Sequence, residues 1–203
     1  MRMKNCFHTT AAVCLFALSG AYIAQGQDKI RWDMISLQFR APSAPNIISA
    51  GGSDSAVNND ATGKAKLRIT ITGSGTFSPW DPTDVTGGGD YTIRNVQGNV
   101  VDSGSYTVTA LVSWVLDSMQ LPANVNNLTD GSADDFRNGL AVFRIAYSDG
   151  SRGILIVSCA GPGASEYPYE GISITKGLVH FQVPDAPVAN VDANRTVFTV
   201  LHN

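Results

Sequence analysis

The chain is poor in residues that form cross-links and metal sites. It holds three cysteines and three histidines among 203 residues. Cys6 and Cys14 lie in an N-terminal segment that we expect to be removed, so Cys159 remains alone and an intramolecular disulfide is excluded. Only His180 and His202 lie outside that segment, which excludes a three-histidine zinc site. We therefore predict no metal site and no cofactor, and we interpret Cys159, within the apolar run GILIVSCA, as a buried small hydrophobe.

Glutamate and lysine are also scarce. Among the 17 acidic residues only Glu166 and Glu170 are glutamate, and the others are aspartate. Aspartate is typical of turns and caps, whereas glutamate and lysine favour the exposed faces of helices. This composition indicates strands and turns with little helix.

The first 26 residues have the pattern of a signal peptide. Arg2 and Lys4 precede the apolar run AAVCLFALSGAYIA, and AQG supplies the small residues that a signal peptidase recognises. The run is shorter than the roughly 20 residues of a spanning helix, so we predict no membrane span. We expect a secreted protein, or a periplasmic one in a Gram-negative source. Without this segment the formal charge of −3 becomes more negative, which argues against a nucleic-acid partner.

Segments with alternating or continuous apolar residues predict eight strands. They lie near 29–39, 65–73, 89–96, 104–117, 139–148, 153–160, 171–183 and 196–201. We predict one all-β domain over 27–203 with about eight antiparallel strands, for which a closed up-and-down, calycin-like barrel is favoured over a β-sandwich. Segment 41–64 is expected to be a long mobile connection. The stretch GSADDFRNG predicts one short helix that Ser132 caps.

The longest predicted strand is SYTVTALVSWVL. One face is expected to carry Tyr106, Val108, Ala110, Val112, Trp114 and Leu116. Such a length is typical of a coiled barrel strand or of a strand with a bulge.

One hairpin places a charge among apolar residues. Asp149-Gly150 is a preferred sequence for a two-residue type I′ turn. With that turn Tyr147 faces Arg152, Arg144 lies beside Leu155, and both faces of the hairpin are apolar; a bulge would shift this register. A buried cation needs a partner. We therefore predict that Arg144 anchors a polar or anionic group of a ligand.

The stretch TGSGTFSPWDPTDVTGGGDY is rich in glycine. A phosphate-binding loop requires a helix after the glycines and a Lys-Ser/Thr pair, and neither is present. We interpret these glycines as turn and bulge positions. Asp81, Asp84 and Asp90 match no known calcium-loop spacing.

Weaker candidates lie elsewhere in the chain. Glu166 and Glu170 could reach the distance that separates the two carboxylates of a glycosidase, but any two residues four apart in a loop could do the same. Trp80 and Tyr169 fall in or near loops, where exposed rings can stack on sugars, whereas Trp32 and Trp114 are expected in the core.

Two further kinds of candidate complete the set. Asp33, in the first strand, is a weak candidate for a polar group in a cavity. Asn127 and Asn194 begin the sequons NLT and NRT, which matter only in a eukaryotic source.

The stretches VTGGGDYT, SGSYTVTALVSW, LAVFRIAYSDGSRGILIVSC and EGISITKG resemble a family of small exported all-β proteins. The resemblance covers most of residues 66–200. It implies an exported β domain and attaches no activity and no catalytic residue.

Three function classes remain open. The first is a secreted, non-catalytic protein that binds a small molecule in its barrel, with Arg144 as the anchor. The second is an enzyme, an isomerase, cyclase or hydrolase, that uses a barrel cavity and a group such as Asp33. The third is an extracellular module that binds glycans or a partner protein through Trp80 or Tyr169. The sequence does not indicate an oligomeric state.

Overall fold

A computed structural model describes residues 28–202 except 41–43, 60, 61, 63, 120, 122–124, 167, 168 and 186–190. Its strands are β1 (Lys29–Gln38), β2 (Asn46–Ala50), β3 (Ser53–Asn59), β4 (Ala65–Thr72), β5 (Ser74–Phe77), β6 (Gly88–Asn95), β7 (Val100–Asp117), β8 (Val125–Leu128), β9 (Phe136–Tyr147), β10 (Arg152–Cys159), β11 (Gly171–Lys176), β12 (Val179–Phe181), β13 (Val183–Pro184) and β14 (Ala193–Leu201). The all-β prediction is confirmed.

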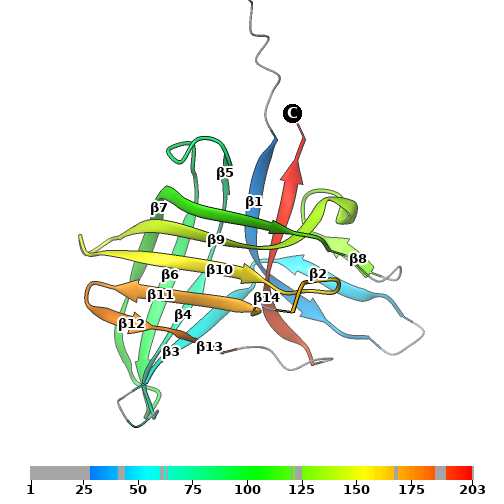
Figure 1. Ribbon diagram of the computed structural model, residues 1–203. Coiled ribbons are helices and arrows are strands. Elements are labelled where there is room, and N and C mark those ends of the chain that lie inside the picture. The colour runs from blue at the N-terminus through cyan, green and yellow to red at the C-terminus, as the bar shows by residue number, and fades with distance from the viewer. Residues whose placement is uncertain are drawn as a thin grey trace, which may run out of the picture.

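Six of these strands close into an antiparallel barrel. Around the ring, β1 pairs with β5, β5 with β6, β6 with β7, β7 with β9, β9 with β14, and β14 with β1. The remaining strands extend the sheet from the ring. In Figure 1, β10, β11 and β12 continue from β9 across the front, while β4 and β3 continue from β6 behind them. The short strand β13 pairs with β3. A closed antiparallel barrel is therefore present, but it has six strands in the ring, and the described chain has fourteen strands instead of about eight.

Aromatic side chains fill the inside of the ring. Phe77 lies at the centre, with ring centroids 5.4 Å from Phe143, 5.2 Å from Trp114 and 6.4 Å from Phe198. Trp32 packs on Phe143 at 5.6 Å and is fully buried, as predicted. Such edge-to-face packing at 4.5–7 Å is typical of a dense core.

Glycines allow this packing at one crossing. A Cβ on Gly75 would lie 2.2 Å from the carbonyl oxygen of Thr86 and 2.8 Å from Nε1 of Trp32. Gly87, with φ of +102°, faces Gly75 across the same contact. These glycines thus permit a close approach of backbones beside the core tryptophan. Gly75 lies within β5, so its role is close packing and not the turn or bulge that we predicted.

Two bulges interrupt β7. Its pairing with β9 shifts between Val108 and Ala110 and again between Leu111 and Ser113, so that Thr109 and Val112 are the extra residues. Each bulge inverts the alternation of side chains that follows. For this reason Leu111 is buried and Val112 is exposed, contrary to the expected alternation, whereas Trp114 still packs against the core.

The β9–β10 hairpin has a three-residue turn instead of the predicted two-residue turn. The Tyr147 N–H donates to the Ser151 carbonyl at 2.9 Å, and the Gly150 N–H donates to the Tyr147 carbonyl at 3.0 Å. Gly150 takes φ of +84°, as in a type I turn followed by a glycine bulge. The register therefore moves by one residue, and Arg144 pairs with Ile154 instead of Leu155.

The other differences concern segments that are polar in sequence. Within 41–64, where we expected a mobile connection, residues Asn46–Ala50 and Ser53–Asn59 form β2 and β3, because both pair along their length with neighbouring strands. The predicted short helix is a single 3₁₀ turn, Ala133–Asp135, and the side chain of Ser132 caps it as expected.

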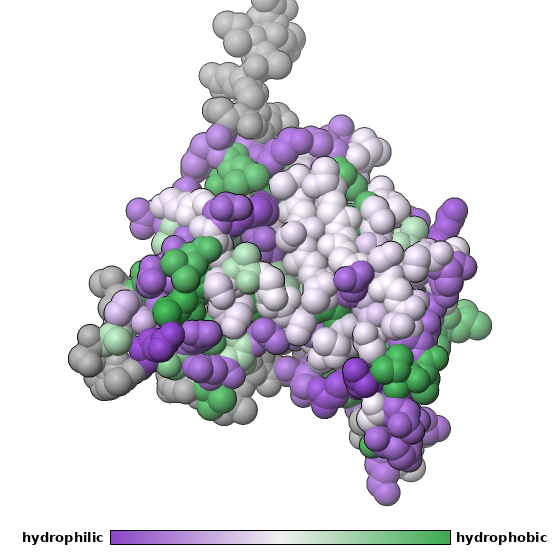
Figure 2. Space-filling model, turned by 180° about the vertical axis from the view of Figure 1, so that it is seen from behind, coloured by the Kyte–Doolittle hydropathy of each residue, from purple (hydrophilic) through white to green (hydrophobic). Residues whose placement is uncertain are grey.

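The outer face of β3, β4, β6 and β7 is rich in hydroxyl groups. Ser55, Thr70, Thr92 and Ser103 occupy one row across the four strands. Figure 2 shows the rear of the molecule as a broad area of intermediate hydropathy, in which apolar groups stand apart from one another. A continuous apolar patch is not seen on this face of the described chain.

Candidate functional site

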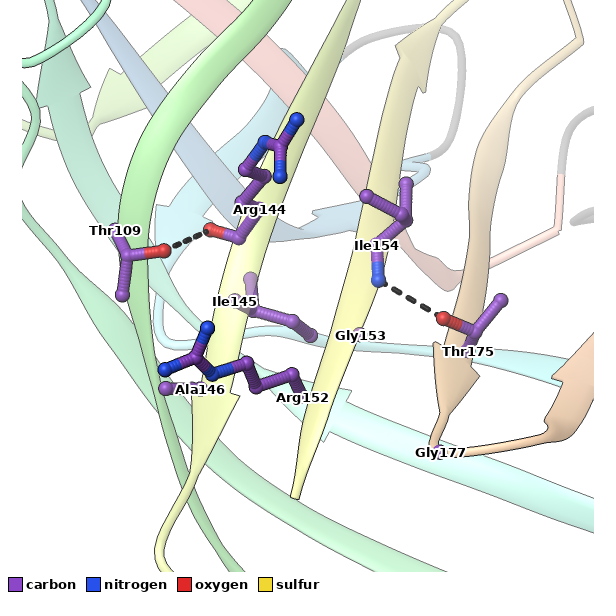
Figure 3. Close-up of a pocket in the computed structure, with 9 residues that line it drawn as sticks. All are labelled: Thr109, Arg144, Ile145, Ala146, Arg152, Gly153, Ile154, Thr175 and Gly177. Carbon is purple, nitrogen blue, oxygen red and sulfur yellow. Dashed lines mark hydrogen bonds between the residues drawn. The ribbon is translucent and has the colours of Figure 1, made fainter. Parts of the chain in front are cut away.

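A groove with two arginines lies on the outer face of the β7–β9–β10–β11 sheet (Figure 3). We call it the double-arginine groove; it has a volume of about 490 Å³ and is lined by Thr109, Arg144, Ile145, Ala146, Arg152, Gly153, Ile154, Thr175 and Gly177. The volume lies within the roughly 300–1,000 Å³ that is usual for small-molecule sites.

The register of the hairpin puts both arginines on one face. Arg144 of β9 pairs with Ile154, and Arg152 of β10 pairs with Ala146, so the arginines are diagonal neighbours. Diagonal cross-strand neighbours lie within reach of long side chains. Figure 3 shows Arg144 above and Arg152 below, with Ile145 between them in this view and Ala146 beside Arg152.

Neither arginine is neutralised by the part of the chain that the structure describes. Arg144 and Arg152 are exposed, and neither guanidinium group forms a hydrogen bond or ion pair with a described residue. The side chains of the other described arginines have partners, for example Arg31 with Asp33 at 2.6 Å, Arg68 with Asp185, and Arg195 with the ring of Phe39. Two like charges side by side without a counter-ion repel each other. The groove is therefore a site of unbalanced positive charge.

Two threonine hydroxyls complete the lining. Thr109, the first bulge residue of β7, donates to the carbonyl of Arg144 at 3.1 Å. Thr175 accepts from the N–H of Ile154 at 2.9 Å, so its own hydroxyl proton remains available to a ligand. The groove thus offers guanidinium and hydroxyl donors from three adjacent strands.

A separate cation next to the groove already has its partners. Lys176 lies 2.9 Å from Asp102, contacts Asp149, and stands over the rings of Tyr91 and Tyr147. The hydrogen bond from Lys176 is the largest of the causes that lower the pKa of the Asp149 carboxyl. We assign this cluster to holding the hairpin ends together, because its charges satisfy one another.

A second basic hollow differs in this respect. It has a volume of about 340 Å³ and is lined by Val57, Lys66, Leu67, Arg68, Arg94, Asn95, Val96 and Gly98. Arg68 pairs with Asp185, and Arg94 donates to the carbonyl of Gly98 at 3.0 Å. Its arginines are thus already engaged, which makes it the weaker anion site of the two.

A third hollow surrounds Trp80. We call it the Trp80 groove; it has a volume of about 690 Å³ and is lined by Asp28, Ile30, Pro79, Trp80, Pro82, Leu111, Val112, Ser113, Trp114, Leu116, Arg137, Val200 and His202. Tyr169, the other aromatic candidate, is not among these residues and is half-buried. Burial raises the pKa of Tyr169, and Asp54 adds to this effect.

The remaining predicted residues have structural partners. Asp33 is buried and accepts from Nε of Arg31, and burial raises the pKa of its carboxyl despite this cation. Asn127 uses its amide nitrogen on the Gly131 carbonyl at 2.9 Å, and Asn194 donates to Ser53 at 3.0 Å. Neither Asp33 nor the two asparagines lines one of the three grooves.

The two glutamates differ in environment. Glu166 is exposed. Glu170 accepts from the backbone N–H groups of Ala160 and Thr196, each at 2.7 Å, and burial raises the pKa of its carboxyl. These bonds occupy both oxygens of Glu170, which assigns the residue to joining β10, β11 and β14.

One buried carboxyl group was missed by sequence reasoning. Asp54 in β3 is 6% exposed, and burial raises its pKa to about 7, with the neighbouring carboxylate of Glu170 adding to the effect. One oxygen accepts from the Ser55 N–H at 2.7 Å, and the other is buried without a hydrogen-bond partner among the described residues. The sequence does not indicate this burial, because residues 53–56, SDSA, have the polar composition of a loop.

The free thiol and the ion-binding groups add no further site. Cys159 is buried, as predicted, and lies 3.4 Å from Oδ1 of Asn138. Among the described residues no group of three or more His, Cys, Asp or Glu side chains could hold a metal ion. No helix within the described ranges is long and apolar enough to cross a membrane.

Compared with models of protein families, with curated proteins and with solved structures, the chain shows no significant match to any of them.

Proposed function

We propose that the protein is a secreted, non-catalytic binding protein that holds an anionic small molecule in the double-arginine groove. The observation that carries the proposal is the location of Arg144 and Arg152. They are the described arginines whose guanidinium groups have no protein partner, and both line the same groove. The predicted signal peptide, residues 1–26, lies outside the described residues and supports export from its sequence pattern alone.

The chemistry of the lining favours carboxylate, sulfate or phosphate groups. A guanidinium presents a planar fork of donors that matches two oxygens of such a group, and it stays charged at all physiological pH values. Thr175 adds a hydroxyl donor beside the two forks. The groove carries two positive charges, whereas the whole chain has a formal charge of −3, so the attraction is local to this face.

The site lies outside the barrel because the inside of the ring is occupied. Phe143 and Phe198 both pack on Phe77 there, and all three have 0% exposure. The prediction that Arg144 is a buried cation that anchors a ligand inside the barrel is wrong, because Arg144 is exposed. The present proposal gives Arg144 a different role, on the outer face of the sheet. The enzyme alternative finds less support, since Asp33, the group chosen for it, is paired with Arg31.

The test is a binding screen with anions of defined charge. Thermal unfolding is followed in inorganic sulfate, inorganic phosphate, citrate and a trimer of galacturonic acid, with sodium chloride at equal ionic strength as the reference. At least one of them is expected to raise the Tm of the wild type and not that of the Arg144→Ala/Arg152→Ala variant. Loss of one arginine is expected to raise Kd about ten-fold, since it removes hydrogen bonds to a charged group.

A charge-matched control separates site binding from general screening. The Arg40→Ala/Lys64→Ala variant loses the same charge from exposed positions that line none of the three grooves. It should keep the wild-type response. Equal responses of the wild type and of the variant without Arg144 and Arg152 would refute the proposal.

A further inference from the structure

Trp80 is exposed on a loop that is held rigidly. The indole is 70% exposed, which is unusual for so large an apolar group. Around it, Ser78 Oγ accepts from the N–H groups of Trp80 and Asp81, each at 3.3 Å, and the Ser78 N–H donates to the Asp84 carbonyl at 3.0 Å. Lys29 binds the Asp84 carboxylate at 2.7 Å. Because these bonds already hold the loop, a ligand that contacts the Trp80 ring does not have to order the loop when it binds.

Strand β7 supplies the opposite wall of the Trp80 groove. Its second bulge turns Val112 outward, and Leu116 beyond it is also exposed. Trp114 packs beneath, with its ring 5.2 Å from Phe77 and 4.6 Å from Phe198. The groove thus has apolar walls on a floor that belongs to the core.

The polar groups of the groove carry both signs of charge. The Asp28 carboxylate accepts from Nδ1 of His202 at 3.1 Å, and Arg137 contributes a guanidinium that also donates to the carbonyl of Asp134. Ser113 adds a hydroxyl. Unlike the double-arginine groove, this one has no excess of a single sign, so its lining favours a ligand without net charge.

We propose that the Trp80 groove binds a neutral oligosaccharide, at a site separate from the anion site. A pyranose ring has an apolar C–H face that suits an exposed indole, and a rim of hydroxyls that pair with carboxylate, guanidinium and hydroxyl groups. The volume of about 690 Å³ lies in the usual range of roughly 300–1,000 Å³ for ligand sites.

A flat protein partner fits this groove less well. A stable protein interface buries about 800 Å² on each side and has an apolar centre. Here the exposed apolar side chains of the groove are Trp80, Val112 and Leu116, and charged groups interrupt them. Mixed apolar and polar groups in a hollow match the two surfaces of a sugar ring.

Isothermal titration calorimetry of the full mature chain tests the proposal. The probes are cellotetraose, xylotetraose, maltotetraose and tetra-N-acetylchitotetraose, each up to 10 mM. We expect one of them to bind, Trp80→Ala to raise its Kd about ten-fold or more, and Trp80→Phe to raise it less because a ring remains. Leu178→Ala, which removes another fully exposed apolar side chain, is the matched control and should bind as the wild type does.

The other outcomes overturn the proposal. Failure of all four probes to bind the wild type would do so, as would equal binding by Trp80→Ala. A wild type that is dimeric by analytical ultracentrifugation and becomes monomeric in Trp80→Ala would instead assign the groove to self-association. Loss of oligosaccharide binding in Arg144→Ala/Arg152→Ala would contradict a site separate from the proposed anion site, whereas binding that persists in this variant would support it.

Discussion

Replacement of Asp54 by asparagine is expected to change how the stability of the fold depends on pH. The Asp54 carboxyl is buried between β3 and its neighbours, and burial is the main cause that raises its pKa to about 7 from 3.8. The backbone N–H of Ser55, 2.7 Å away, opposes the shift only in part. Asparagine keeps the acceptor for Ser55 and removes the ionisable group.

The sign follows from where the proton is held. Between about pH 4 and 7 the unfolded chain releases the Asp54 proton, while the folded chain keeps it, so wild-type stability falls as the pH rises through this window. At about 1.4 kcal/mol per pH unit, the total reaches about 4 kcal/mol by pH 7 and grows no further above it. Asp54→Asn should therefore match the wild type at pH 4 and exceed it by up to about 4 kcal/mol at pH 8.

Urea denaturation followed by tryptophan fluorescence at pH 4, 5.5, 7 and 8 measures this difference. Asp90→Asn removes the same charge from an exposed position and should show no such trend. A constant difference between Asp54→Asn and the wild type across the four pH values would refute the reasoning. So would a variant that loses stability at pH 8, because Asp54 would then be stabilised as an anion.

Three further predictions concern the core, the hairpin ends and the thiol. Gly75→Ala should lower the free energy of unfolding by about 3 kcal/mol, because the added Cβ would lie 2.2 Å from the Thr86 carbonyl, and urea denaturation would show it. Lys176→Met should cost about 2 kcal/mol by the same assay, since it removes the ion pair to Asp102 and the contacts with two tyrosine rings. An unchanged free energy of unfolding in either variant would contradict the contacts described. The Cys159 thiol, buried and with its pKa raised by burial, should react with Ellman's reagent only at the rate of unfolding; rapid reaction in the native state would contradict its burial.

Strand positions could be predicted from the sequence where one face is apolar. The segment 153–160 coincides with β10 (Arg152–Cys159) to within a residue, because its apolar run is bounded by glycines. Strand β3 could not be predicted in this way, since residues such as Asn58 and Ser55 are polar, and β2 is only five residues long and has no alternating pattern. Their pairing with β1 and β4 stabilises them, and such long-range contacts leave no local pattern.

The candidate site depended on one turn. With a two-residue turn at Asp149-Gly150, Arg152 shares a face with Tyr147; with the observed three-residue turn it shares a face with Arg144. Asp149 favours this longer turn by accepting from the N–H and hydroxyl of Ser151 at 2.9 and 2.7 Å. The sequence therefore indicated Arg144 as unusual, but only the register shows that it has a second arginine beside it.

Arginine side-chain NMR locates an anion most directly. In a sulfate titration of the ¹⁵N-labelled protein at constant ionic strength, the Nε–H resonances of Arg144 and Arg152 should shift with one common Kd, together with the amide of Gly177 in the same groove. The Nε–H resonances of Arg68 and Arg94, whose Nη1 atoms already bind protein groups, should move little. Shifts confined to Arg68 and Arg94, or spread evenly over all exposed arginines, would contradict the claim that the double-arginine groove is the anion site.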